Sequence, residues 1–275
     1  MALVTTIIDG QELEVERDTW ALDACRRLGK EIPTLCHHPA LEPYGACRLC
    51  VVEVRKGNRE PWLATSCDLP IREGLDIRTD TEAVHKARRT AMELLLAEAP
   101  DAPALRDMAE RLGVRESRFA PRQPDNRCIL CGLCVRACRD LIGVSAIGFS
   151  GRGPDRRIGS PFDVQTDACI GCLACVAVCP TDAIRVTDRD GVRVMETFHT
   201  ELAMVPCESC GRPAMPGKML DYLRERLPEG VPCPALCPSC RQESTAQAVG
   251  MGAAAALTAR YPEGCRAVEV SAETG

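Results

Sequence analysis

Apolar and polar residues alternate along residues 3–16, with one break at Asp9-Gly10. An Asp-Gly pair between two alternating segments is the pattern of a tight β-hairpin turn. Val51, Val52 and Val54 indicate a further strand, Gly57-Asn58 a turn, and Trp62-Leu-Ala-Thr the return strand. Residues 1–81 therefore predict a small α+β unit built on two hairpins.

A short helix is predicted between these hairpins. Asp18 or Thr19 would cap its N-terminus, and its apolar face would carry Trp20, Leu22 and Leu28.

Apolar residues recur at helical spacing between residues 82 and 114. A stretch rich in alanine and proline at residues 97–104 divides this region into two helical segments, and Pro121 and Pro124 mark a linker. From Gln242 the chain is rich in alanine and predicts a helix followed by a loose tail.

Cysteine is the residue that sets the chemistry. The chain has 19 cysteines in 275 residues but only 3% aromatic residues, so small domains with thin cores would need covalent or metal staples. The sequence shows no secretory signal and no apolar run of membrane length, the best candidate being a short stretch near residues 250–257. We therefore expect a cytoplasmic protein whose cysteines bind metal, and not a secreted disulfide scaffold. The net charge of −5 lacks the basic footprint of a nucleic-acid-binding protein.

A repeated cysteine motif is the strongest signal in the chain. Cys128-x2-Cys131-x2-Cys134-x3-Cys138 recurs as Cys169-x2-Cys172-x2-Cys175-x3-Cys179-Pro180. The first copy is followed by Val-Ser-Ala-Ile and the second by Thr-Asp-Ala-Ile. Zinc ribbons use pairs of Cys-x2-Cys, so two zinc ions fit these triplets poorly. In bacterial two-cluster ferredoxins, which share this motif, the fourth cysteine of each copy ligates the cluster of the other.

The repeat therefore predicts two [4Fe–4S] sites with exchanged fourth ligands. The ligands of the first would be Cys128, Cys131, Cys134 and Cys179, and those of the second Cys169, Cys172, Cys175 and Cys138. Small loop residues, namely Gly132, Gly171 and Ala174, leave backbone N–H groups free to approach the sulfurs.

A second constellation, Cys36-x10-Cys47-x2-Cys50-x16-Cys67, lies in the first unit. Spacing alone leaves zinc open, because the first gap is longer than in plant-type [2Fe–2S] ferredoxins. Its surroundings read Ile32-Pro-Thr-Leu-Cys-His-His-Pro and Gly45-Ala-Cys-Arg-Leu-Cys-Val-Val-Glu-Val. They resemble the [2Fe–2S] domain of the large iron–sulfur subunit of respiratory complex I, and the diaphorase-type subunits of NAD-linked hydrogenases and formate dehydrogenases. The resemblance implies a β-grasp ferredoxin domain in which Cys36, Cys47, Cys50 and Cys67 are the ligands.

One departure from that family lies between the two regions. The family usually carries a His-x3-Cys-x2-Cys-x5-Cys site there for an extra cluster, whereas residues 96–107 contain neither cysteine nor histidine. We expect that cluster to be absent. Cys25 and Cys265 match no motif and are interpreted as unpaired thiols.

A third cluster of cysteines follows the repeat. Cys207-x2-Cys210 and Cys237-x2-Cys240 are separated by 26 residues, which is the pattern of a zinc ribbon with a wide gap. The pieces resemble the zinc ribbon appended to ferredoxin-like subunits of some hydrogenase complexes. We expect one structural Zn²⁺, with a further Fe–S cluster as the alternative because Cys233 supplies a fifth thiol.

The chain thus divides into five predicted parts. They are a [2Fe–2S] domain at 1–81, a helical linker at 82–124, a 2[4Fe–4S] ferredoxin domain at 125–190, a zinc-ribbon-like module at 191–243, and an Ala-rich helix and tail at 244–275.

The predicted function is electron relay within a multi-subunit oxidoreductase. The resemblance implies a flavin-containing NAD(P)H dehydrogenase subunit as one partner and a hydrogenase, formate dehydrogenase or other reductase subunit as the other. No dinucleotide fingerprint follows a predicted strand, so we expect no substrate catalytic site in this chain. A free-standing polyferredoxin shuttle is the alternative, and an Fe–S redox sensor is disfavoured by the acidic charge.

Overall fold

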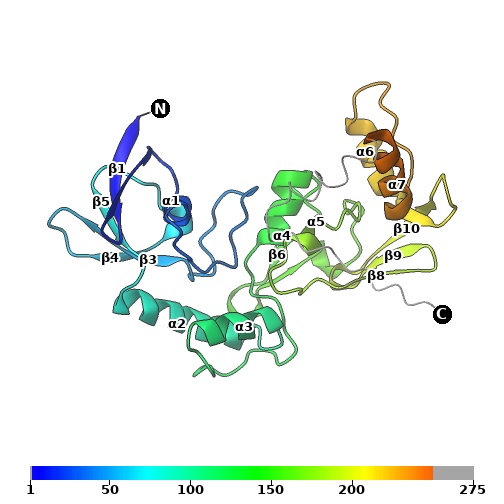
Figure 1. The fold of residues 1–275 in the computed structure, drawn as a ribbon. Coiled ribbons are helices and arrows are strands. Elements are labelled where there is room, and N and C mark those ends of the chain that lie inside the picture. Colours follow the sequence, from blue (N-terminus) through cyan, green and yellow to red (C-terminus); the bar gives the residue numbers. More distant parts are fainter. Residues whose placement is uncertain (1, 250–275) are drawn as a thin grey trace. The chain divides into compact units, whose positions relative to one another are not determined.

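The computed structural model describes residues 2–249, which form two compact units (Figure 1). The first unit contains the residues up to Leu133 together with Pro180–Ala183. The second contains Cys134–Cys179 and the residues from Ile184 on. The end of the predicted alanine-rich segment and Cys265 lie outside the described residues.

The first unit is built on a five-stranded sheet of order β2-β1-β5-β3-β4, in which β1 and β5 are parallel and the other neighbours antiparallel. Its strands are β1 (Leu3–Ile8), β2 (Gln11–Glu16), β3 (Val51–Lys56), β4 (Trp62–Thr65) and β5 (Leu75–Arg78). Its helices are α1 (Ala21–Arg27), α2 (Glu82–Glu98) and α3 (Pro103–Arg111), with a 3-10 turn at Ser66–Asp68. Both predicted hairpins are confirmed, and so is the division of the helical region into two segments.

The turn of the first hairpin has the backbone that its sequence demands. Asp9 and Gly10 have φ angles of 48° and 82°. A type I′ turn needs positive φ at both central residues, and Asp-Gly supplies them at low cost.

The predicted cap of α1 is wrong. The residue that precedes the helix is Trp20, and no side chain caps it. The Thr19 hydroxyl donates instead to the Glu16 carbonyl at 2.7 Å, and the Asp18 carboxylate pairs with Arg72 at 2.9 Å. Both candidate caps are thus taken by contacts outside the helix, one of them with a segment far along the chain.

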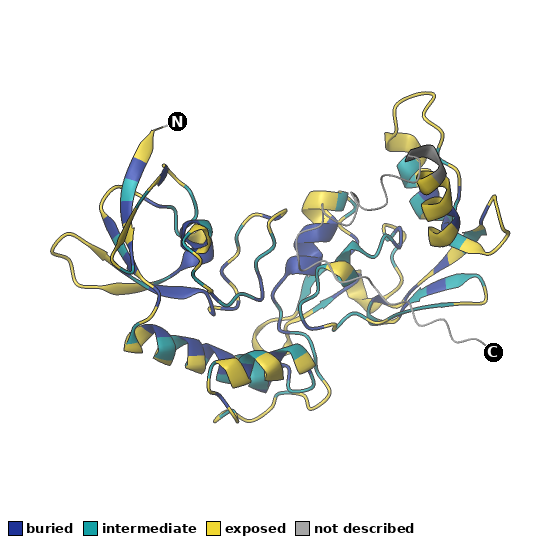
Figure 2. Ribbon diagram, in the orientation of Figure 1, coloured by how far each residue is buried: buried dark blue, intermediate teal, exposed yellow. Residues whose placement is uncertain are grey.

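The core of the first unit lies between α1 and one face of the sheet. Alternating buried and exposed residues along β1 show which face this is (Figure 2). Its fully buried members include Ile8, Leu22, Val52, Val54 and Ile77.

The second unit contains a four-stranded antiparallel sheet of order β11-β10-β9-β8 and a separate β6-β7 hairpin. The strands are β6 (Gly148–Ser150), β7 (Arg157–Gly159), β8 (Val186–Arg189), β9 (Val192–Met195), β10 (Thr200–Pro206) and β11 (Pro213–Pro216). The helices are α4 (Leu133–Arg136), which starts at the boundary, α5 (Ala174–Ala177), α6 (Gly217–Arg226) and α7 (Pro238–Val249), with a π-helical turn at Ala137–Ile142.

Cysteine sulfurs form part of the core of the second unit. Met195, Phe198 and Leu202 pack in one cluster with Cys134 and Cys138. A smaller cluster consists mainly of cysteines, namely Cys207, Cys237 and Cys240. Among residues 2–249, no helix is long and apolar enough to cross a membrane.

The first prediction compares two neighbouring isoleucines of β1. Ile8 is fully buried, whereas Ile7 is 42% exposed on the opposite face. We expect Ile8→Ala to lower the free energy of unfolding of the first unit by about 2–5 kcal/mol, since it leaves a cavity, and Ile7→Ala to change it far less. Trp20 and Trp62 are the two tryptophans of the chain, so tryptophan fluorescence during denaturation reports on this unit. Equal losses in both variants would contradict the difference in burial between the two side chains.

Candidate iron–sulfur and metal sites

The structure gathers the four cysteines predicted for the [2Fe–2S] cluster in the first unit. Cys36 and Cys47 lie in the loop between α1 and β3, Cys50 directly precedes β3, and Cys67 lies in the 3-10 turn after β4. Each is at most 4% exposed. The Sγ atoms of Cys36 and Cys47 are 3.5 Å apart, and the Cys47 N–H donates to the Cys36 sulfur at 3.3 Å.

The thiols of this site interact in two hydrogen-bonded pairs. The hydrogen bond from Cys36 lowers the pKa of Cys47 to about 6, and the same bond raises the pKa of Cys36. The hydrogen bond from Cys67 likewise lowers the pKa of Cys50 to about 7. The charges of Cys50 and Cys36 both act on Cys67, so the two pairs belong to one site.

Backbone and side-chain hydrogen bonds fix the chain at Cys50 and at Val51, the first residue of β3. The Ser66 hydroxyl and N–H donate to the Cys50 carbonyl at 2.8 and 3.0 Å. The buried guanidinium of Arg88, on α2, donates to the carbonyl of the next residue, Val51, at 2.9 and 3.2 Å. Sequence reasoning missed Arg88, because nothing in a helical pattern marks a charged residue that turns inward.

The donor set fits a cationic cluster. Four buried thiols at these distances cannot all ionise, because each thiolate raises the pKa of the next. A positively charged iron centre removes that repulsion, and the converging N–H groups suit thiolate sulfur.

In the second unit, the Cys138 thiol lies within electrostatic reach of the second loop. Burial raises the pKa of Cys175, and the charges of Cys172, Cys169 and Cys138 raise it further. The Ala146 N–H donates to the Cys138 sulfur at 3.2 Å. Cys138, the fourth cysteine of the first copy, belongs to one apolar cluster with Cys169 and Cys175 of the second copy.

The internal repeat is also visible in the backbone. The second and fourth residues after the first cysteine have positive φ in both loops: Leu130 and Gly132 at 53° and 73°, and Gly171 and Leu173 at 69° and 63°. Ser145 and Asp182, which occupy matching places in Val-Ser-Ala-Ile and Thr-Asp-Ala-Ile, have φ of 50° and 51°. The two copies therefore share a conformation that leucine, serine and aspartate adopt at a cost.

The remaining predicted ligands belong to different units. Cys128 and Cys131 are in the first unit, and Cys134 and Cys179 are in the second. Cys131 and Cys134 are buried, and the other two are half-buried. The Asn126 side chain fixes the start of the loop, since its oxygen accepts the Cys128 N–H at 2.9 Å and its nitrogen donates to the Cys128 carbonyl at 3.0 Å.

The C-terminal cysteines form the tightest constellation. The Sγ atoms of Cys207, Cys210, Cys237 and Cys240 all lie within 4.8 Å of one another. Cys207 follows β10, Cys210 lies in the turn before β11, and Cys237 and Cys240 stand at the start of α7. The Cys237 N–H donates to the Cys207 sulfur at 3.3 Å.

Two further residues tie this site together. Glu208 joins the two Cys-x2-Cys segments, because its N–H donates to the Ala235 carbonyl and its carboxylate accepts the Ala235 N–H, both at 2.8 Å. Arg212 Nε donates to the Cys210 sulfur at 3.4 Å.

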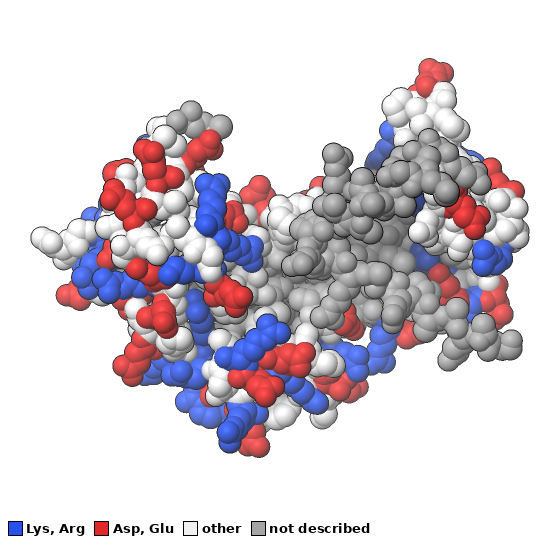
Figure 3. Space-filling view, in the orientation of Figure 1, with Lys and Arg blue, Asp and Glu red and all other residues white. Residues whose placement is uncertain are grey.

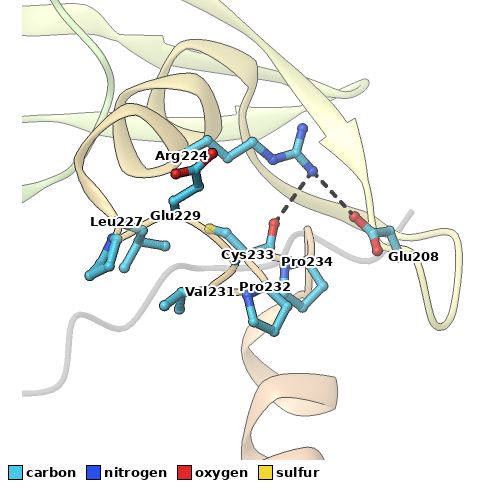
Figure 4. Close-up of a pocket in the computed structure, with 10 residues that line it drawn as sticks. Glu208, Arg224, Leu227, Glu229, Val231, Pro232, Cys233 and Pro234 are labelled. Atoms are coloured by element: carbon cyan, nitrogen blue, oxygen red, sulfur yellow. Dashed lines mark hydrogen bonds and ion pairs between the residues drawn. The ribbon is translucent and has the colours of Figure 1, made fainter.

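Cys233 lies outside this group. It packs against Met215 and Leu220 in a separate apolar cluster. Figure 4 shows it lining a surface pocket, where Arg224 donates to the Cys233 carbonyl at 3.4 Å and pairs with Glu208 at 3.7 Å.

The structure also bears on the predictions made for Cys25, for disulfides and for surface charge. Cys25 is buried in the first unit, and burial raises its pKa to about 12, as befits a thiol that packs in a core. None of the cysteines in residues 2–249 forms a disulfide. Acidic and basic side chains are interspersed on the visible face of the first unit (Figure 3).

Two family models match the chain. Residues 2–82 match a 2Fe-2S iron-sulfur cluster binding domain, and residues 123–186 match a 4Fe-4S dicluster domain. The expected α+β architecture of ferredoxin domains and the presence of both domain types are confirmed.

Curated relatives share this region. A G-type subunit of the NADH-quinone oxidoreductase of Rhizobium meliloti (strain 1021) is 34% identical over 209 residues, which are 66% of this chain and 24% of the relative. The corresponding NADH-quinone oxidoreductase protein of Rickettsia prowazekii (strain Madrid E) is 33% identical over 66% of this chain and 30% of its own length. The alpha subunit of NADPH-Fe(3+) oxidoreductase of Geobacter sulfurreducens (strain DL-1 / KN400) is 32% identical over 66% and 24%. The chain thus spans less than a third of each of these relatives.

A solved structure is also similar. One chain in the crystal structure titled NAD+-reducing [NiFe]-hydrogenase in the H2-reduced state is 34% identical in sequence. The match covers 57% of this chain and 74% of that chain, with a TM-score of 0.49.

Proposed function

We propose that this chain, which joins a [2Fe–2S] domain to a 4Fe–4S dicluster domain, relays single electrons inside a multi-subunit oxidoreductase of the cytoplasm. One partner would be a flavin-containing NAD(P)H dehydrogenase subunit, and the other a catalytic subunit of hydrogenase, formate dehydrogenase or related reductase type. The observation that carries the proposal is the joining of both domain types over the region shared with NADH-quinone and NADPH-Fe(3+) oxidoreductase subunits. Iron–sulfur clusters supply one-electron redox chemistry.

The residues of this chain would bind and shield those clusters. Cys36, Cys47, Cys50 and Cys67 would hold the [2Fe–2S] cluster, and the burial of their sulfurs supports this. The exchanged sets of the repeat would hold two [4Fe–4S] clusters, and the effect of the Cys138 charge on Cys169, Cys172 and Cys175 supports the exchange. In this division the domains are 1–81 and 125–190, joined by the linker 82–124.

For the C-terminal cysteines we propose one structural Zn²⁺ in the module 191–243. Four thiolates around one zinc ion, with Zn–S bonds of about 2.3 Å, have S···S separations of about 3.8 Å in tetrahedral geometry. Cys210 and Cys237 Sγ are 3.7 Å apart, and the whole set lies within 4.8 Å. A four-iron cluster would hold its thiolates farther apart, because each binds a different iron at a corner of the cube. The position of Cys233 outside the group also favours the mononuclear site.

The functional test follows from electron counting. NAD(P)H delivers a hydride, a two-electron package, and the division of that package needs a flavin or comparable cofactor. We expect the purified chain to give no NAD(P)H-dependent dye reduction, dithionite to bleach its visible absorbance, and the flavin-bearing partner to restore rapid reduction. Robust NAD(P)H oxidation by the flavin-free chain, or no reduction of any cluster with the partner present, would contradict the relay.

The exchanged ligand has its own test. We expect Cys138→Ser to perturb the cluster of Cys172 and to give an electron paramagnetic resonance spectrum matching that of Cys172→Ser, since both would ligate the same cube. Cys233→Ser is the control and should leave the spectrum unchanged. A match with Cys131→Ser instead would show that each motif supplies all four of its own ligands.

Metal analysis tests the zinc proposal. Anaerobically purified protein should contain about ten Fe and about one Zn per chain. Cys237→Ser should lose the zinc and keep the iron, whereas Cys233→Ser should keep both. About fourteen Fe with no Zn would assign the C-terminal thiols to a further iron–sulfur cluster.

A further inference from the structure

The C-terminal module contacts the second cysteine loop at its centre. Arg193, on β9, donates from Nη1 to the Gly171 carbonyl at 2.8 Å, and Gly171 lies between Cys169 and Cys172. The other guanidinium nitrogens form a fork on Asp188, at 2.7 and 2.6 Å. Arg193 is 8% exposed, so a fixed guanidinium is held against the loop.

Side chains from two strands of the module also pack closely against this glycine. A Cβ at Gly171 would lie 2.7 Å from Leu202 Cδ1 and 2.8 Å from Pro216 Cγ, which come from β10 and β11. The φ of 69° further favours glycine at this position. Glycine thus allows the sheet to approach the cysteine loop directly.

The helix α6 holds two other segments of the same site. Lys218 Nζ donates to the Asp167 carbonyl at 3.0 Å and to its carboxylate at 3.1 Å, just before Cys169. The Tyr222 hydroxyl donates to the Ile142 carbonyl, at the end of the π-helical turn that contains Cys138. The module therefore contacts both chain segments that carry these cysteines.

The module therefore places two cationic side chains on the backbone of this site. Arg193 binds the carbonyl of Gly171, next to Cys172, and Lys218 binds the carbonyl of Asp167, two residues before Cys169.

We propose that the C-terminal module covers the site of Cys138, Cys169, Cys172 and Cys175, and that Arg193 is a positioning residue which raises the reduction potential of the [4Fe–4S] cluster there. The inference rests on the ligand set of the proposed function. Reduction adds one negative charge to the cluster, and a buried cation nearby stabilises that charge more than water would. The four-cysteine site at the end of β10 would keep the cover in place.

The test is a redox titration of the full chain followed by electron paramagnetic resonance. We expect Arg193→Met to lower one of the two [4Fe–4S] midpoint potentials by about 59 mV. For one electron, this shift equals a tenfold fall in the ratio of reduced to oxidised cluster at a given potential. Arg193→Lys should restore most of the loss, because it keeps the charge. Arg189→Met removes an exposed cation of the same hairpin and should leave both potentials unchanged.

Two further variants separate the possible causes. Arg193→Met leaves Asp188 without its partner, so the double variant with Asp188→Asn should retain a smaller shift in the same direction. Lys218→Met should lower the same potential and leave the buried ion pair of Arg193 with Asp188 intact.

Unchanged potentials in Arg193→Met with full iron content would overturn the proposal. Where that variant loses iron, unchanged potentials in Lys218→Met would do the same. Absence of [4Fe–4S] signals from the wild-type chain would instead refute the proposed ligand set.

Discussion

The fold depends on thiols that are buried at distances where they repel one another once ionised. The four cysteines of the first unit are almost fully buried, and the hydrogen bond between Cys36 and Cys47 raises the pKa of the first and lowers that of the second. In the C-terminal module three of the four sulfurs are themselves most of a small apolar cluster. A cation that binds these sulfurs therefore contributes to folding as well as to redox chemistry, since little other core would replace it.

The same constraint explains the backbone of the repeat. Thiolates that converge on one centre need N–H groups turned toward them, and a loop achieves this with left-handed residues at two fixed places. Each loop has one glycine and one leucine there, in opposite order. The leucines Leu130 and Leu173 adopt an unfavourable conformation, so the geometry of the cysteines outweighs local backbone preference.

The sequence predicted those features that depend on residues close together in the chain. The Asp9-Gly10 hairpin and the two helical segments depend on spacing within a few residues, and the expected 2Fe-2S and 4Fe-4S dicluster domain types were found. The predicted cap of α1 was wrong because Arg72, about fifty residues away, pairs with the carboxylate of Asp18. Arg88 and Arg193 were missed for the same reason, since their partners are carbonyls that no motif marks.

These two arginines share a physical role that distinguishes them from surface cations. Each is buried, and each donates to a carbonyl within one residue of a cysteine in a predicted ligand set. A buried charge in such a place must be compensated, and Arg193 has Asp188 for this purpose. Burial lowers the pKa of Arg88, and the negative charge of the Cys50 thiolate opposes that effect. The thiolate sites and the buried arginines therefore stabilise one another electrostatically.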